Sequence, residues 1–338
     1  MHMADALISP TVGVTLWAAS TATLAWCSRR IRQGDEERLI PLMGVLGAFV
    51  FAVQMINFTI PATGSSGHIG GGLLLSILLG PHAACVVIAS ILTVQALFFA
   101  DGGLLALGAN IFNLGVFPCF AGYLLVYRPL LGADRLASSQ RRITIVATLA
   151  AVVGSQLGAF AVVLETMFSG ISNLPISTFL LLMQPIHLAI GLVEGLATAI
   201  VILFVRRARP DLFMANAASP IPISSRKPLL LALGIATVLT AGVFSWFAST
   251  QPDGLEWSIA HAAGSATLPA PESGFHTAQA QHKITGMTDD KPPTGRSNEA
   301  AWPAVDSSRS LASLIGAAIT LGLVISIGYL LRRRRSSS

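Results

Sequence analysis

Residues 178–205 read TFLLLMQPIHLAIGLVEGLATAIVILFV, and this stretch decides the fold class. Glu194 is its only Asp, Glu, Lys or Arg residue. An apolar segment of about 18 residues or more can cross the ~30 Å hydrocarbon core of a bilayer as a helix. The whole chain is similarly apolar, with 53% hydrophobic and 11% charged residues, whereas soluble domains carry about 25% charged residues. We therefore expect an integral membrane protein.

Comparable apolar segments recur along the chain and predict an all-α fold. The predicted spans are residues 9–27, 39–57, 68–80, 82–100, 104–127, 143–166, 178–205, 228–249 and 310–331. The third span is short because Pro81 cannot continue a helix and disfavours helical geometry in the preceding Gly80. A single segment that kinks at this point is the alternative.

Most of the 21 lysines and arginines lie in clusters beside the predicted spans. The clusters occupy 29–38, 128–142, 206–227 and 332–335, and they follow the first, fifth, seventh and ninth spans. Cytoplasmic loops of membrane proteins carry the excess of Lys and Arg. We therefore expect all four clusters on the cytoplasmic side, with the N-terminus outside and the C-terminus in the cytoplasm. The net charge of +5 thus comes from clusters that set the orientation of the chain in the membrane and not from a basic surface on a soluble domain. No nucleic-acid partner is expected.

The basic cluster at 206–227 also contains prolines, which is typical of a cytoplasmic linker between two modules. Residues 1–205 form the predicted seven-helix bundle. Residues 228–338 form a predicted accessory module with two further transmembrane helices. These helices flank an extracytoplasmic loop, 250–309, whose part from about 265 to 305 is too polar to pack a core.

The start of the chain and its cysteines also carry information. No basic residue precedes the first span and a basic cluster follows it, which is the reverse of a signal peptide, so we expect the start to be retained. Cys27, Cys85 and Cys119 occur singly in apolar segments. This spacing predicts buried packing residues and no disulfide framework or zinc site.

Two of the seven histidines, His2 and His68, are placed where a metal ion arriving from outside would be met. His2 offers its imidazole, its backbone amide and the adjoining Met1 amine, which together can close fused chelate rings on one metal. His68 lies in the glycine-rich segment TGSSGHIGGG (63–72), where missing side chains let other backbone approach closely. It can complete a plane of four nitrogens, although a lone loop histidine is more often solvated. Such a plane favours Cu(II) or Ni(II), and nitrogen sites prefer nickel to cobalt.

Several short motifs follow one another in a recognisable order. They are the opening Met1-His2, AVQMINF (52–58), SGH (66–68), LGP (79–81), QALF (95–98), DGGLLALGAN (101–110) and PDGLE (252–256). Up to residue 205 the chain resembles the substrate-binding subunit of energy-coupling-factor transporters for nickel and cobalt. PDGLE is similar to the start of the outside loop in the small two-span accessory subunit of the same systems. The chain thus resembles a fusion of the two subunits.

The resemblance implies a function, a location and partners. It implies high-affinity uptake of Ni²⁺ or Co²⁺, as cargo and not as cofactor, across the cell (inner) membrane of a bacterium or archaeon. SGH followed by glycines, together with DGG (101–103), is closer to the nickel branch than to the cobalt branch. The implied partners are a transmembrane coupling subunit and two cytoplasmic ATPase subunits. The sequence has no G-x-x-x-x-G-K-[ST] motif, so ATP hydrolysis is expected elsewhere and the chain is not expected to be an enzyme.

The resemblance further implies that Met1 and His2 fold back into the helical core, where His68 completes the metal site. Polar partners usually orient metal-ligating histidines. The candidates for this role are Asn57, Ser66 and Asn110, and hydrogen bonding between helices is the alternative role for each.

The apolar segment 178–205 contains two titratable side chains. His187 and Glu194 are two helical turns apart, so they lie on one face and can pair. We expect Glu194 to lie in the cytoplasmic half and to serve packing or a partner contact. Gly44, Ala48 and Ala52 form a smooth helix face that suits either a partner or internal packing.

Two other functions compete with metal capture. A stand-alone metal carrier or channel would thread several ionisable residues through its spans, and few occur here. An intramembrane hydrolase would use Ser65 or Ser66 as nucleophile and His68 as base. The sequence contains no H-E-x-x-H and no G-x-S-x-G motif, which disfavours this class.

Overall fold

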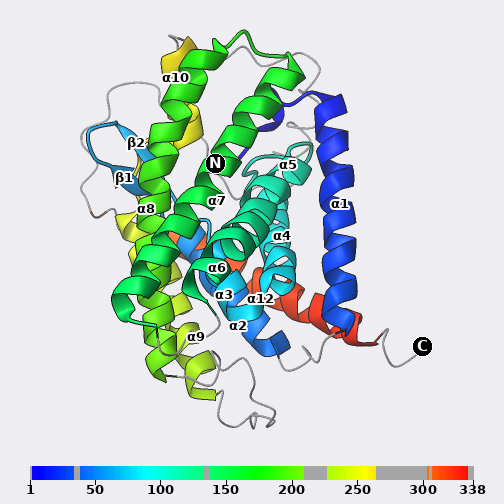
Figure 1. Ribbon diagram of the computed structural model, residues 1–338, viewed down its shortest axis with the longest axis vertical. Helices are drawn as coiled ribbons and strands as arrows, with labels where there is room; N and C mark the ends of the chain where they lie inside the picture. Colours follow the sequence, from blue (N-terminus) through cyan, green and yellow to red (C-terminus); the bar gives the residue numbers. More distant parts are fainter. Residues whose placement is uncertain are drawn as a thin grey trace.

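Long helices make up most of the structure, a computed structural model that describes residues 2–33, 39–132, 138–208, 227–263, 303 and 307–333. In chain order the elements are η1 (Asp5–Leu7), α1 (Pro10–Gln33), α2 (Ile40–Gln54), β1 (Phe58–Ile60), β2 (Ser65–Gly67), α3 (Gly72–Leu79), α4 (Pro81–Phe98), α5 (Leu107–Ile111), η3 (Phe112–Tyr127), α6 (Arg128–Leu131), α7 (Gln140–Ser169), α8 (Ile176–Ala208), α9 (Lys227–Gly242), η6 (Phe244–Phe247), α10 (Gly254–Ala263) and α12 (Ser307–Arg333). In Figure 1, α1 stands on one side, α7 and α8 stand on the other, and α3 to α6 lie between them.

Within these residues, five helices are long and apolar enough to cross a membrane. They are Pro81–Phe98, Leu107–Leu131, Gln140–Ser169, Ile176–Ala208 and Ser307–Arg332. Two shorter apolar helices, Ile40–Gln54 and Lys227–Gly242, coincide with two further predicted spans. The prediction of a multi-pass, mostly helical membrane protein is therefore confirmed.

The third predicted span, 68–80, differs from the prediction. Its helix, α3, contains only 8 residues, and at 1.5 Å per residue it is about 12 Å long, too short to cross a bilayer. Gly80 has φ +85° and ψ 156°, and α4 begins immediately after it at Pro81. These angles lie outside the helical region. The predicted break is thus present and the single kinked segment is wrong, but α3 does not count as a full crossing.

A β-hairpin, absent from the all-α prediction, lies between the second and third predicted spans, and residues 68–71 after it are not helical. β1 pairs with β2 in antiparallel register, with Phe58 opposite Gly67 and Ile60 opposite Ser65. Gly71, at the N-cap of α3, has φ +76°, a left-handed conformation that glycine adopts without strain. The hairpin and the turn after it therefore deliver the segment 65–71 to the interior of the bundle.

The second module packs on α2 through small residues. A Cβ on Gly44 would lie 2.6 Å from Ile325 Cγ1, and a Cβ on Gly47 would lie 3.3 Å from Val324 Cγ2. Both partners belong to α12. At Gly44, the face of small residues that α2 presents therefore packs against α12 of the second module and not against a separate partner.

The beginning of the predicted outside loop is ordered as α10, which packs against α8 and β2. Figure 1 shows α10 beside α8. Residues 264–302 and 304–306 of the predicted loop, and residues 209–226 of the predicted linker, lie outside the described residues. Cys27, Cys85 and Cys119 are buried free cysteines, as predicted.

Candidate metal centre

The N-terminal segment folds back into the bundle and buries His2, which is 6% exposed. Asn110 holds the next residue, since its Oδ1 accepts from the Met3 N–H at 2.5 Å and its Nδ2 donates to the Met3 carbonyl at 3.0 Å. The Asp5 N–H donates to the Gly102 carbonyl at 3.0 Å. Gly102, with φ +85°, is required here because a Cβ would clash with the Asn110 amide. These contacts fix the position of His2.

His68 reaches the same place from the hairpin and is 9% exposed. The turn that follows is held from two sides. Glu194 on α8 accepts from the Gly70 N–H at 3.2 Å and from the Gly71 N–H at 2.9 Å. On the other side, Gln54 Nε2 donates to the Gly70 carbonyl at 2.6 Å. The backbone next to His68 is therefore anchored on α8 and α2.

The two imidazole rings lie against each other. Their centroids are 5.0 Å apart and their planes differ by 27°. His2 Nε2 and both ring nitrogens of His68 are buried and have no hydrogen-bond partner. An unpaired buried polar atom costs about 1–3 kcal/mol, so a bound ion or water that meets one nitrogen of each ring would stabilise this place.

Burial keeps these imidazoles neutral. Burial, as the largest cause, lowers the pKa of His2 to about 3 and that of His68 to about 3. Both residues lie outside the spanning helices. A metal ion binds the neutral imidazole, so the rings present available lone pairs throughout the physiological pH range. Asp101 Oδ1 lies 3.5 Å from His2 Nδ1 and supplies negative charge.

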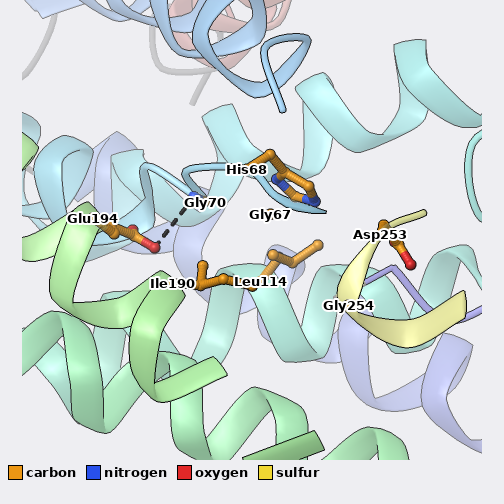
Figure 2. Close-up of a pocket in the computed structure, with 8 residues that line it drawn as sticks. All are labelled: Gly67, His68, Gly70, Leu114, Ile190, Glu194, Asp253 and Gly254. Atoms are coloured by element: carbon orange, nitrogen blue, oxygen red, sulfur yellow. Dashed lines mark hydrogen bonds between the residues drawn. The ribbon is translucent and has the colours of Figure 1, made fainter. Parts of the chain in front are cut away.

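A small cavity opens beside His68. It is lined by Gly67, His68, Gly70, Leu114, Ile190, Glu194, Asp253 and Gly254, and Figure 2 shows these residues. Its free space is about 10 Å³, on the order of one water-sized sphere. This space suits a single ion and is too small for an organic substrate.

Side chains alone do not form a complete metal shell in the part of the chain that the structure describes. No group of three or more His, Cys, Asp and Glu side chains is placed to hold a metal ion there. A metal held by His2 and His68 would therefore need additional ligands. Met1, the predicted source of one of them, lies outside the described residues.

Of the three residues predicted to orient the histidines, one holds the N-terminal segment and two make contacts with the second module. Asn110 holds the N-terminal segment, as described above. Ser66 donates its hydroxyl to the Gln251 carbonyl at 2.8 Å and the Pro252 carbonyl at 3.2 Å. The Asn57 carbonyl accepts from the Ser249 N–H at 2.7 Å. Ser66 and Asn57 thus connect the hairpin to the second module.

The pair suggested for His187 and Glu194 does not form. His187 Nδ1 lies 2.8 Å from the Met183 carbonyl, one helical turn earlier. Glu194 instead accepts from the Gly70 and Gly71 N–H groups, an internal contact as expected, and this contact holds the turn that follows His68. The available signal was the carboxylate itself, because an ionisable residue in an apolar helix marks a functional site by default.

The geometry also bears on the hydrolase alternative. Neither ring nitrogen of His68 has a hydrogen-bond partner, and Ser66 donates to backbone carbonyls of the second module. Ser65 Oγ lies 2.8 Å from Thr63 Oγ1. A nucleophile must be within hydrogen-bond reach of its base, and neither serine meets this condition.

Comparisons with known proteins agree with the two-module reading. Residues 2–212 match the family model described as the cobalt uptake substrate-specific transmembrane region, and residues 227–333 match the PDGLE domain. A putative fused nickel transport protein of Archaeoglobus fulgidus is 36% identical over 218 residues, which are 64% of this chain and 70% of that protein. A fused nickel transport protein of Rhodobacter capsulatus is 31% identical over 255 residues, which are 71% of this chain and 70% of that protein.

The chain is also similar to a cobalt transport protein and to two solved structures. A cobalt transport protein of Geobacter sulfurreducens is 33% identical over 63% of this chain and 61% of that protein. The crystal structure of a transition metal transporter aligns with a TM-score of 0.54 and 27% identity, over 63% of this chain and 96% of that chain. A truncated transition metal transporter aligns with a TM-score of 0.53 and 28% identity, over 61% of this chain and 99% of that chain.

Proposed function

Because the chain belongs to the cobalt uptake substrate-specific transmembrane family and carries a PDGLE domain fused behind it, we propose that it captures Ni²⁺, in preference to Co²⁺, for high-affinity uptake. In this fusion of a substrate-binding subunit with a small accessory subunit, the metal is cargo. One observation carries the proposal: three unpaired imidazole nitrogens are buried together on His2 and His68, beside a cavity of single-ion size.

The proposed ligands are the Met1 amine, the His2 amide, the His2 imidazole and the His68 imidazole. Four nitrogens in a plane favour Ni²⁺ over Co²⁺, and Cu²⁺, which they also favour, is limited by its availability. The names of the fused relatives, which are nickel transport proteins, support the same preference.

The energy for uptake comes from partners in this proposal. The sequence has no phosphate-binding loop motif, so we assign ATP hydrolysis to two cytoplasmic ATPase subunits that act through a transmembrane coupling subunit. The chain lies in the inner membrane of a bacterium or archaeon with its N-terminus outside and its C-terminus in the cytoplasm. Residues 1–205 bind the metal, 206–227 link the modules, and 228–338 form the accessory module.

A carrier that works without ATPases is less well supported. The buried carboxylates of α7 and α8 accept hydrogen bonds from other segments of the chain: Glu165 accepts from Asn113 at 3.0 Å and Glu194 accepts from Gly70 and Gly71. Uptake into vesicles that contain this chain alone would favour the carrier.

The direct test is metal content and Ni²⁺/Co²⁺ competition on the purified chain. The paired control carries one extra residue before Met1, which moves the amine away from His2. We expect about one Ni²⁺ per chain, lost in the extended form and in His68→Ala. Binding that survives the extension would refute the chelate, whereas a preference for Co²⁺ would refute only the assigned metal.

A further inference from the structure

The second module reaches the metal centre through the segment before α10. The Ser66 N–H donates to the Pro252 carbonyl at 2.8 Å, and Ser66 pairs with Asp253 as an isolated parallel bridge. Thr59 Oγ1 donates to Ser249 Oγ at 2.8 Å. Residues 249–253 therefore run along the hairpin, joined to it by these hydrogen bonds and by the single bridge at Ser66, two residues before His68.

The PDGLE motif fixes one carboxylate at this place. Asp253 Oδ1 accepts from the Glu256 N–H at 2.8 Å, and Glu256 Oε2 accepts from the Asp253 N–H at 3.4 Å. This reciprocal arrangement is a capping box at the start of α10. Gly254 lets the backbone approach α8, because a Cβ there would lie 2.7 Å from Ile186 Cγ2. The motif thus presents Asp253 to the cavity that His68 lines, as Figure 2 shows.

A divalent ion in this cavity needs negative charge nearby. The rings of His2 and His68 are neutral donors, and both residues are more than nine-tenths buried. Moving a dication out of water is costly unless opposite charge is close. Asp101 lies beside His2, and Asp253 interacts electrostatically with both His2 and His68. One carboxylate from each module therefore lies near the two imidazoles.

We propose that Asp253 is a charge-balancing residue of the metal centre, contributed by the PDGLE segment of the second module. The accessory module is then a part of the binding site, and the site reaches full affinity only when residues 249–263 are docked on the hairpin and α8. This inference rests on the proposed function, because it assumes a divalent ion at His2 and His68.

The test compares Ni²⁺ affinity of Asp253→Asn with that of the unchanged full chain. Asparagine is as good an N-cap as aspartate, so this variant removes the charge and keeps the cap. We expect Kd to rise about 10–100-fold, the usual cost of losing a group that supports metal ligands. Asp253→Glu restores the charge, and we expect it to recover part of the affinity.

Glu165→Gln is the matched control. Glu165 is a buried carboxyl residue on α7, and it is not among the residues that line the cavity. We expect its Kd to stay within about threefold of that of the unchanged chain. The proposal is overturned if Asp253→Asn binds Ni²⁺ normally, if Glu165→Gln loses as much affinity, or if Asp253→Glu recovers none.

His68→Ala separates this inference from the proposed function. If His68→Ala abolishes Ni²⁺ binding and Asp253→Asn does not weaken it, the metal centre stands and only the role of Asp253 falls. If His68→Ala binds Ni²⁺ normally, the metal centre itself is wrong. Thermal unfolding of each variant in detergent shows whether it is folded, and a folded Asp253→Asn with unchanged Kd overturns the inference directly.

Discussion

At the scale of single residues, Glu194 shapes the turn that follows His68. Its carboxylate accepts from the Gly70 N–H at 3.2 Å and the Gly71 N–H at 2.9 Å. In Glu194→Gln one acceptor oxygen becomes an NH₂ group that only donates, which leaves a buried amide N–H unpaired. We expect Ni²⁺ affinity to fall about 10–100-fold, measured by calorimetric titration of the purified chain.

Glu165→Gln is the control for that substitution. Glu165 is also a buried carboxylate in an apolar helix, but it accepts from Asn113 at 3.0 Å and is not among the residues that line the cavity. We expect this variant to bind Ni²⁺ as the unchanged chain does. Equal losses in both variants would show that Glu194 acts only through general stability.

The same residues show how much of the candidate site can be predicted from the sequence. His2 and His68 can be selected from the sequence because their type and glycine-rich surroundings point to metal binding, and Asn110 because a polar residue in an apolar span needs a partner. Glu194 is marked as a carboxylate in an apolar helix, but neither its contacts nor those of Asp253 can be predicted in this way. Their contacts join residues more than a hundred positions apart, and no local pattern records which distant backbone they meet.

At the scale of elements, Gly44 sets the distance between α2 and α12. A Cβ there would lie 2.6 Å from Ile325 Cγ1, so Gly44→Val overfills the contact and should cost about 1–3 kcal/mol. We expect a lower thermal unfolding midpoint. Gly322→Ala on α12 is the control, because a Cβ at Gly322 would have no atom within 4 Å and alanine favours helix. A midpoint unchanged in Gly44→Val would contradict this packing.

The long helices could be predicted because hydropathy over about 20 residues is a strong signal. The break at Gly80 and Pro81 could also be predicted, since proline restricts the backbone on both sides of the peptide bond. The hairpin β1–β2 and the short length of α3 could not. Strands of 3 residues and a helix of 8 residues carry too few side chains to show a period, so tertiary contacts decide them.

At the scale of the whole molecule, basic residues gather where helices end together. Arg206 Nη1 on α8 donates to the Ser138 carbonyl before α7 at 2.7 Å, and Arg142 Nη2 on α7 donates to the Leu130 carbonyl on α6 at 2.9 Å. α10, which begins beside the cavity that His68 lines, and the C-terminal end of α12 lie toward opposite ends of the molecule in Figure 1. From the positive-inside rule we expect the proposed metal centre to lie toward the outside.

Cysteine labelling tests this orientation with little background, because Cys27, Cys85 and Cys119 are buried. Glu256 in α10 and Arg141 at the start of α7 are both exposed, so each can carry a single reporter. We expect a membrane-impermeant maleimide to label Glu256→Cys in intact cells and Arg141→Cys only after the membrane is opened. The reverse pattern would place the metal centre on the cytoplasmic side, and capture of an external ion by His2 and His68 would then be impossible without a prior transport step.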